Sequence, residues 1–369
     1  MKVLQMLDSL NRGGIEMMAL DVCRRAAASG LDLTFVATGG GDLEKEFASS
    51  GTEFIRLQRR LPVDLRLASE LRRIIKERNV RVVHCHQAVD ALHGFLATRG
   101  TQVKRVLTFH GWLPSAKNRV AVNFLIPRMD ANLAVSQEVW RRLGEELHFD
   151  TSGNFRVLYN GVDGRRIGGG EPRPRRELRL KEDALLAGMT GNFYVGVKDQ
   201  MTVCRALPQV FRQAPGLHFA FIGGRSPSAP QLFDDCVQFC REQGISERVH
   251  FLGKRTDIPD LLSALDLFVF SSLEEGSPIA VIEAMMKGLP CLVSDIAALV
   301  EVSKQGVYAR MFRAQDAGDL AQKFIELINS PDERARLGAQ GAKWANAQFS
   351  IETHLENLKR LYSTLVGVA

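Results

Sequence analysis

Two glutamates lie in the stretch of sequence whose residue types point most clearly to chemistry. Glu275 lies in a turn that follows the apolar run Leu267–Phe270, and Glu283 lies among apolar residues in the helix that comes after the turn. The turn reads Gly276-Ser277-Pro278, and proline suits the first turn of a helix. A carboxylate among apolar residues is costly unless something pairs with it. Ribose hydroxyls would pair with Glu283, and a salt bridge inside the core is the alternative.

Backbone N–H groups at the same turn point to an anion or a sugar. The amides of Gly276, Ser277 and Ile279 stand at the start of a helix, where N–H groups lack partners within the helix. Lys198 follows the first apolar strand of the second half of the chain, and a cation there would neutralise a departing phosphate. An exposed helix lysine is the alternative.

One histidine stands at the end of a predicted strand in the first half. His110 follows Arg105–Phe109, and substrate is expected at such a strand end, although a structural histidine is the alternative. His84 and His86 share one face of the preceding strand and are expected to support or pack. Near the start, Gly13 and Gly14 would let the backbone approach a bulky anion, or would only form a tight turn. No Gly-x-Gly-x-x-Gly or Walker sequence occurs, which disfavours a nicotinamide enzyme.

The elements that must position these residues alternate between apolar strands and amphipathic helices. This alternation predicts parallel sheets with right-handed crossovers, and ligands bind beyond the carboxyl ends of such strands. The predicted strands are Val3–Leu7, Leu33–Ala37, Phe54–Leu57, Val80–Cys85, Arg105–Phe109, Ala131–Val135, Phe155–Leu158, Ala184–Met189, His218–Ile222, Val249–Leu252, Leu267–Phe270, Cys291–Val293 and Val307–Met311.

The chain of 369 residues is too long for one ordinary core, so two domains are expected. The rhythm of strands and helices breaks at Gly164–Glu182, which is rich in arginine and glycine and is interpreted as a linker. The predicted domains are residues 1–165 and 166–349. Two α/β domains placed face to face would enclose a cleft. Pro331–Ala347 and Ile351–Val366 are predicted to be helical.

Composition narrows the class of protein. The net charge of +6 permits anionic partners, but no zinc-finger spacing or aromatic RNA-binding motif indicates nucleic acid. The six cysteines form no Cys-x-x-Cys, which fits a reduced, cytoplasmic protein. No apolar run is long enough to span a membrane, and the first residues are interpreted as a strand and not as a signal peptide. A peripheral position at the inner face of the membrane stays open.

Taken together, these motifs resemble the retaining glycosyltransferases of family four, also called group one, which have the GT-B fold. The two glutamates with seven residues between them are the most specific part of the resemblance. The match runs through nearly the whole chain and rests on Gly13-Gly14, His110-Gly111, Tyr159-Asn160-Gly161-Val162-Asp163, Lys198, Phe251-Leu252-Gly253, Glu275 through Glu283 with Ala284-Met285, and Gly288-Leu289-Pro290.

The resemblance implies a role for each of these residues. Glu275 would hold hydroxyls of the donor sugar, Lys198 would stabilise the departing diphosphate, and His110 would contact the transferred sugar. Glu283 would bind the ribose. The donor-binding set would be completed by the two glycine-rich turns and the edge of the nucleobase site, namely Gly13, Gly14, Asn192, Gly253, Arg255, Gly276, Ser277, Pro278 and Ile279. Neither a metal nor a cofactor is implied. The final helix, about residues 350–369, would fold back onto the first domain.

Two departures from the family pattern concern the donor. Members usually carry an arginine shortly before the lysine, whereas this chain has Asn192 and Phe193 there; Arg225 is a candidate replacement. Gly276-Ser277-Pro278 stands in place of the more common Gly-Phe-Gly, so the donor sugar stays open.

The function expected from the resemblance is transfer of a hexose-type sugar from a nucleotide-sugar. A UDP-sugar is favoured and a GDP-sugar comes next, with a glycan or lipid-linked acceptor in bacterial surface polysaccharide or glycolipid synthesis. Trp112, Lys117 and Arg119 are expected on the acceptor side, and contact with an anionic membrane is one further expectation. The alternatives are a catalytically degenerate binding partner and an enzyme similar to a nucleotide-sugar epimerase.

Overall fold

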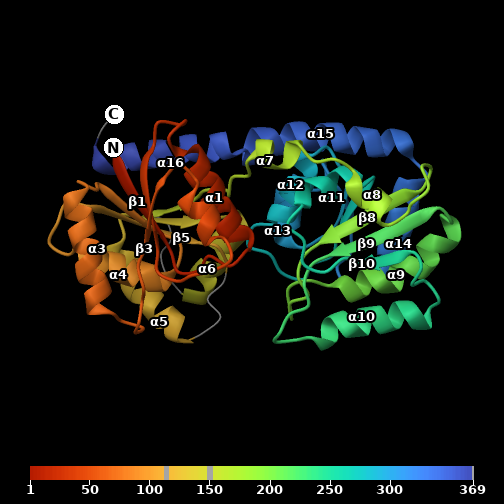
Figure 1. The fold of residues 1–369 in the computed structure, drawn as a ribbon, viewed down its shortest axis with the longest axis horizontal. Coiled ribbons are helices and arrows are strands. Elements are labelled where there is room, and N and C mark those ends of the chain that lie inside the picture. Colours follow the sequence, from red (N-terminus) through yellow and green to blue (C-terminus); the bar gives the residue numbers. More distant parts are fainter. Residues whose placement is uncertain (112–115, 148–152, 368–369) are drawn as a thin grey trace. The chain divides into compact units, whose positions relative to one another are not determined.

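The computed structural model of the chain describes residues 1–111, 116–147 and 153–367, and for 116–118 and 146–147 it describes the backbone alone. The chain divides into two compact units (Figure 1). Unit 1 comprises Met1–Val162 and Phe349–Ala369, and unit 2 comprises Asp163–Gln348. The expected boundary after residue 165 lies three residues too late, because the side chain of Asp163 accepts a hydrogen bond from the amide of Arg165 and so begins the first helix of unit 2.

Unit 1 is built on a seven-stranded sheet in the order β3-β2-β1-β4-β5-β6-β7, and every neighbouring pair is parallel. Its strands are β1 Lys2–Leu7, β2 Asp32–Ala37, β3 Glu53–Arg56, β4 Val82–Cys85, β5 Lys104–Phe109, β6 Ala131–Ala134 and β7 Phe155–Val157. Its helices are α1 Gly14–Ala26, α2 Glu44–Ala48, α3 Leu65–Glu77, α4 Ala88–Thr98, α5 Ala116–Leu125, the 3-10 turn η1 Ile126–Arg128, α6 Gln137–Leu147 and α16 Ile351–Val366.

Most residues of the inner strands of this sheet are buried, which is why β1 and β2 are mainly apolar after their first residue. Successive residues of a strand point to opposite faces. In β1, Val3 and Leu7 pack with residues of α1 and α16, while Leu4 and Met6 pack with residues of α3 and α4. Figure 1 shows α16 beside α1 and shows α3 and α4 together.

The last helix, α16, docks on unit 1 through the Asn160-Gly161-Val162 stretch. A Cβ on Gly161 would lie 2.6 Å from the Cβ of His354, so only glycine permits this approach. Val162 donates its N–H to Phe349 and accepts one from Ile351, both at 2.9 Å. The buried stripe of α16 ends at Tyr362, whose hydroxyl reaches into the core. The family-like motif at the end of the first domain therefore has a structural role here.

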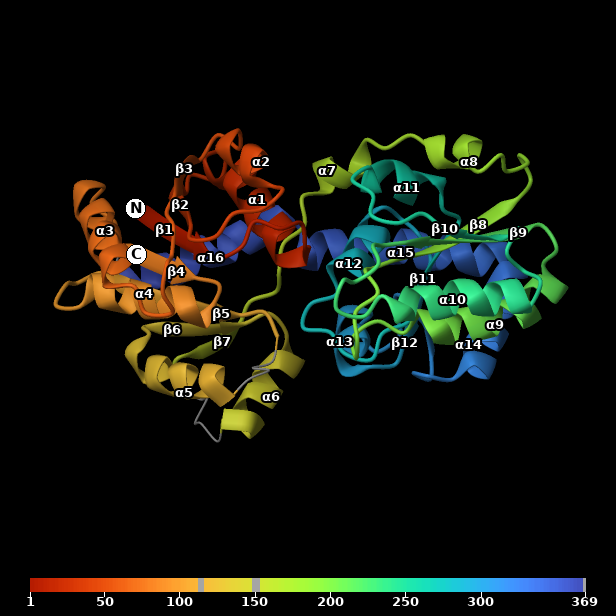
Figure 2. The same cartoon turned by 60° about the horizontal axis from the view of Figure 1, so that its bottom comes forward.

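Unit 2 is built on a six-stranded sheet in the order β10-β9-β8-β11-β12-β13, again all parallel. Its strands are β8 Leu185–Thr190, β9 Leu217–Ile222, β10 Val249–Phe251, β11 Leu267–Phe270, β12 Cys291–Ser294 and β13 Arg310–Phe312. Its helices are α7 Gly164–Gly168, α8 Arg173–Glu177, α9 Gln200–Gln213, α10 Gln231–Glu242, α11 Ile258–Ala264, α12 Ile279–Met286, α13 Ala297–Val302, α14 Ala317–Ile328 and α15 Pro331–Phe349. Helices α9, α10 and α14 lie on one side of the sheet, and α8 and α11 lie on the other (Figure 2).

The segment interpreted as a linker is an ordered part of unit 2, and that prediction was wrong. It contains α7 and α8, and Ile167 and Pro174 are buried. Arg175 donates to the carbonyls of Ala264 and Ala184 and to the carboxylate of Asp266. Ala264 and Asp266 lie far from Arg175 in the sequence, so no local pattern indicates these two contacts.

Candidate functional site

Three loops of unit 2 meet at the carboxyl ends of β8, β9 and β10. A Cβ on Gly223 would overlap the carbonyl of Gly191, so glycine lets the first two loops touch. The Oδ1 atom of Asn192 accepts the N–H of Gly224 at 2.7 Å. Asn192, predicted to bind donor, thus holds two of the loops together.

Lys198 and Glu275 form an ion pair at the carboxyl end of β11. Both side chains are largely buried, with 13% and 9% of their area exposed. Ser272 also donates its hydroxyl to the Oε1 atom of Glu275, at 2.7 Å. The ammonium of Lys198 lies 4.7 Å from the ring centre of Phe270, a cation–π geometry. Two residues predicted separately from the sequence are therefore neighbours, and the alternative of an exposed helix lysine is excluded.

The turn before α12 has its predicted local geometry. Pro278 precedes the helix, which begins at Ile279. The amide of Ile279 donates to the carbonyl of Ser277 at 2.9 Å, so in this structure that amide already has a partner. A ligand in the turn would have to take that amide from Ser277 or use the amides of Gly276 and Ser277.

Glu283 forms a buried ion pair with Arg166. The Nη2 atom of Arg166 lies 2.8 Å from the Oε1 atom of Glu283, and 15% and 10% of the two side chains are exposed. The costly buried carboxylate anticipated from the sequence thus has a charged partner. Arg166 belongs to α7, and no sequence pattern distinguished it from the other basic residues of the expected linker. Binding of ribose by Glu283 stays a prediction.

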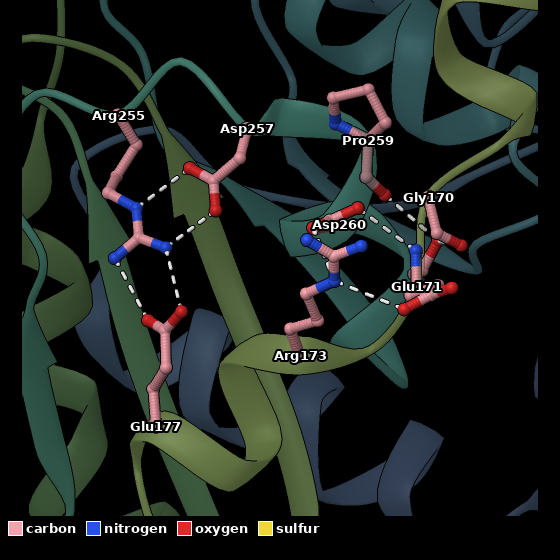
Figure 3. A network of polar contacts seen from close by, with 9 residues as sticks. Gly170, Glu171, Arg173, Glu177, Arg255, Asp257, Pro259 and Asp260 are labelled. Atoms are coloured by element: carbon pink, nitrogen blue, oxygen red, sulfur yellow. Dashed lines mark hydrogen bonds and ion pairs between the residues drawn. The ribbon is translucent and has the colours of Figure 1, made fainter.

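Arg255 is held between two carboxylates, as Figure 3 shows. It donates to Asp257 at 2.8 and 2.6 Å and to Glu177 of α8 at 3.0 and 3.4 Å. These hydrogen bonds raise the pKa of the guanidinium further. Beside it, Gly253 has a φ of +65°, which suits glycine. Arg255 thus secures α8 to the loop after β10, and its predicted place beside the nucleobase stays a prediction.

The same close-up explains why α8 lies against α11. A Cβ on Gly170 would overlap the carbonyl of Pro259, so the chain can press onto the start of α11 only with glycine there. Glu171 donates its N–H to Asp260 at 3.0 Å, and Arg173 pairs with the carboxylate of Glu171 (Figure 3).

Arg225, the candidate replacement for the arginine that the family usually carries, is already paired with another side chain. That guanidinium pairs with Asp234 of α10, and both side chains are about half exposed. Phe193, near the position where the arginine would stand, is buried against the rings of Phe221, Phe233 and Phe251. This position contributes to the core of unit 2 and carries no charge.

In unit 1, the Gly13-Gly14 turn begins α1 at the carboxyl end of β1. A Cβ on Gly13 would lie 2.6 Å from the Oε2 atom of Glu16, so this carboxyl group covers the turn. Burial, with the nearby charges of Asp8 and Asp42, raises the pKa of Glu16 to about 7. The turn therefore lies beside a carboxyl group that holds its proton more tightly than usual.

A second set of glycines, which the sequence analysis did not select, supports that turn. Cβ atoms on Gly39 and Gly41 would overlap the backbone of Asp8 and of Leu10, so the loops after β1 and β2 pack directly on each other. The signal available was the run of three glycines directly after a predicted strand. Under these loops, Thr38 donates its hydroxyl to Asp90 at 2.8 Å.

His110 follows β5 and is hydrogen-bonded to another histidine. The Nε2 atom of His110 lies 2.9 Å from the Nδ1 atom of His86. His84 is bound on both sides, to Tyr362 and to Thr108, at 2.6 Å each. Burial lowers the pKa of His86 to about 3 and lowers the pKa of His84 and His110, so these rings are neutral near pH 7. The expected supporting place of His84 and His86 agrees with these contacts.

Two of the three residues predicted on the acceptor side have side chains that the structure does not describe. Trp112 lies outside the described residues, and so does the side chain of Lys117. Arg119 is exposed on α5. Across residues 1–111, 116–147 and 153–367, no group of three histidine, cysteine or acidic side chains is arranged to hold a metal. In the same ranges no helix is long and apolar enough to cross a membrane.

Comparison with known proteins places this geometry in a family. The profile described as Glycosyltransferase Family 4 matches residues 12–166, and the profile described as Glycosyl transferases group 1 matches residues 184–330. The chain is 24% identical to N-acetyl-alpha-D-glucosaminyl L-malate synthase of Bacillus anthracis, over 82% of this chain and 79% of that protein. It is 27% identical to UDP-Gal:alpha-D-GlcNAc-diphosphoundecaprenol alpha-1,3-galactosyltransferase of Escherichia coli, over 63% of this chain and 62% of that protein.

The fold is shared with solved structures. The crystal structure of Anabaena HepE in complex with UDP and glucose matches with a TM-score of 0.83 and 20% identity, over 99% of this chain and 100% of that one. The predicted α/β class with two parallel sheets is confirmed. Because the two profiles together match most of both units, the chain belongs to the family 4, or group 1, glycosyltransferases and has their two-domain, Rossmann-like GT-B fold.

Proposed function

We propose that the chain is a retaining glycosyltransferase that moves a hexose-type sugar from a nucleotide-sugar to a glycan or lipid-linked acceptor. UDP-sugars are the first choice of donor and GDP-sugars the second. The E. coli relative is named for UDP-galactose and a diphosphoundecaprenol acceptor, and HepE was crystallised with UDP, which supports this order. A step in bacterial surface polysaccharide or glycolipid synthesis is part of the proposal.

The observation that carries the proposal is the buried pair of Lys198 and Glu275. The pair lies at the carboxyl end of a parallel strand, near the start of α9 and α12, where a doubly wound sheet binds its ligand. A bound donor would replace the contact between Lys198 and Glu275 with one new contact to each of the two side chains. The diphosphate would take the ammonium of Lys198, and the sugar hydroxyls would take the carboxylate of Glu275.

Transfer then depends on charge at the leaving group. The bond between the anomeric carbon and the diphosphate oxygen breaks, and the acceptor oxygen bonds to the same face of that carbon. The acceptor proton passes to the departing phosphate. Lys198 and helix N-termini would stabilise the negative charge that develops, so the proposed reaction needs no metal. Glu283 would hold the ribose, and His110 would contact the transferred sugar.

A thermal-shift screen with UDP, GDP, ADP, CMP and their common sugar conjugates tests the proposal. The screen is run without added metal and again with a chelator. A site that binds one nucleotide should raise the melting temperature with that nucleotide and its conjugates, because a ligand that binds only the folded state stabilises it. The shift should survive the chelator.

The other outcomes separate the alternatives. No shift with any nucleotide would favour the degenerate binding partner, for which Phe193 in place of the usual arginine is the supporting observation. A shift accompanied by conversion of the donor into its epimer, detected by NMR of the sugar, would favour an epimerase-like enzyme. A shift that disappears with chelator would contradict transfer without a metal.

A further inference from the structure

The contact between His86 and His110 is a feature that the proposed mechanism does not yet use. The ring nitrogens that face each other lie 2.9 Å apart, and the ring centres lie 5.2 Å apart. The two outer nitrogens, Nε2 of His86 and Nδ1 of His110, are buried and have no hydrogen-bond partner among the described residues. A buried polar atom without a partner is costly, so a ligand that satisfies it would be favoured.

Counting protons shows what the pair can offer. Each neutral imidazole carries one N–H, and the contact between the rings uses one of the two. The second proton must lie on one of the outer nitrogens. If His86 donates, the Nδ1 atom of His110 carries the outer N–H; if His110 donates, its Nδ1 atom is a bare acceptor. The tautomers of the two rings are therefore coupled, and the kind of hydrogen bond that His110 can make changes with the tautomer of His86.

The surroundings hold both rings neutral and in place. His86 is 5% exposed, and its ring centre lies 4.6 Å from that of His84. His84 is itself held between Tyr362 of α16 and Thr108 of β5. His354 of α16 disfavours protonation of His86 and His110 through its charge when protonated, and burial lowers its own pKa to about 4. The ring of His86 therefore packs against a histidine that is itself held by contacts to α16 and β5.

We propose that His86 is a positioning residue that occupies the Nε2 atom of His110 and leaves the Nδ1 atom to bind a hydroxyl of the transferred sugar. This inference rests on the proposed function. His86 touches neither donor nor acceptor in it. It acts by fixing the orientation and the tautomer of His110, as partners of metal-bound histidines do.

The chain contains a matched control pair. His218 and His250 are also joined through Nδ1 and Nε2, at 3.0 Å, with stacked rings. They lie on β9 and β10 of unit 2, and His218 stands near the amino end of its strand, away from the loops that carry the proposed donor site. Loss of that contact should alter one histidine pair without altering catalysis.

The experiment compares His86→Leu, His86→Asn and His218→Gln with the unchanged chain. Long-range proton–nitrogen NMR of the histidine rings reports the tautomer and the titration of His110, with its signals assigned by their loss in His110→Gln. Turnover and KM are measured with the nucleotide-sugar that gives the largest thermal shift. In His86→Leu we expect a mixture of tautomers at His110, a pKa of His110 closer to its ordinary value, and turnover about 10- to 100-fold lower with little change in KM for the donor.

The rescue variant makes the result specific. The asparagine side chain introduced by His86→Asn has an amide that can bond to the Nε2 atom of His110 as donor or as acceptor, so this variant should keep the ring of His110 in place and recover much of the turnover. His218→Gln should change neither the tautomer of His110 nor the turnover. A single, unchanged tautomer of His110 in His86→Leu would overturn the proposal, and so would normal turnover with an altered tautomer. If no donor is turned over by the unchanged chain, the proposed function fails, while the NMR result still decides whether His86 sets the state of His110.

Discussion

The two units handle several of their ionisable groups in different ways. In unit 2 the carboxylates are paired with cations, Glu275 with Lys198 and Glu283 with Arg166. In unit 1 burial suppresses charge: it lowers the pKa of His86 to about 3 and raises the pKa of Asp90 to about 7.

This difference corresponds to two kinds of ligand. An ion pair that is largely removed from water can exchange partners with a ligand that carries both charge and hydroxyl groups, as a nucleotide-sugar does. Neutral rings and a carboxyl group that retains its proton favour hydrogen bonds to uncharged groups. In the proposed function, unit 2 would bind the nucleotide together with sugar hydroxyls at Glu275, and the neutral groups of unit 1 would bind further hydroxyl groups. Each half of this comparison can be tested separately.

The largest expected effect comes from the ion pair at β11. Lys198→Ala should lower turnover by about 100- to 1,000-fold, with a smaller change in donor affinity, because the ammonium would act mainly on charge that develops in the transition state. Steady-state kinetics with the donor from the nucleotide screen measure this effect. Lys323→Ala is the control, since Lys323 pairs with Glu326 on α14 at 3.5 Å. Unchanged turnover in Lys198→Ala would reduce the pair to a structural salt bridge.

A smaller effect is expected at the ion pair of Arg166 and Glu283. Variants of this pair distinguish a role in binding UDP from a role in stabilising the fold. Glu283→Gln should weaken UDP binding by about tenfold or more, as expected for loss of a hydrogen bond to a charged group. Arg166→Gln should leave UDP affinity unchanged or increase it, because Glu283 loses a competing partner. Calorimetric titration with UDP measures both affinities.

The variant that combines Glu283→Gln with Arg166→Gln completes that test. Each single change leaves one buried charge with a partner fewer and should lower the melting temperature, and the double variant should recover part of the loss. If Glu283→Gln unfolds more easily but binds UDP normally, Glu283 is a core residue and not a ribose ligand.

Much of the fold could be predicted from the sequence, because buried parallel strands and amphipathic helices leave periodic patterns. The predicted spans Leu267–Phe270 and Ile351–Val366 coincide with β11 and α16. The strand predicted at Val307–Met311 corresponds to β13, which is Arg310–Phe312. The prediction begins too early because apolar residues that precede this short strand continue its sequence pattern.

The helices α7 and α8 could not be predicted, because the contacts that stabilise them are made with residues far away in the sequence. Glycine and arginine in that segment give no helical period, and what holds it is the close approach of Gly170 to Pro259 and the bonds of Arg255 to Glu177. The same limit applies to the site. Lys198 and Glu275 were each selected by their place after a strand, but the ion pair between them, and the role of Arg166, depend on which loops the fold brings together.

The smallest expected effect concerns the suppressed charge of unit 1. Burial, with repulsion from Asp8, raises the pKa of Asp90 to about 7, whereas an unfolded aspartate titrates near 3.8. Between these values the unfolded chain has released the proton and the folded chain retains it, so stability should fall as pH rises from about 4 to about 7. Asp90→Asn keeps a neutral group beside Thr38 and should reduce this loss. Urea unfolding near pH 5 and pH 7.5 measures the difference.

Asp64 provides the opposite case within the same unit. Hydrogen bonds from the backbone amides of Arg60, Leu67 and Arg66 lower its pKa, so it is ionised throughout this pH range. Asp64→Asn should therefore shift stability equally at both pH values and leave the pH dependence as it was. Glu16, with its pKa raised to about 7, adds a loss of the same sign as Asp90, so Asp90→Asn should remove only part of the slope. If Asp90→Asn retains the whole slope, burial does not suppress the charge of Asp90, and the contrast between the two units then rests on the histidines alone.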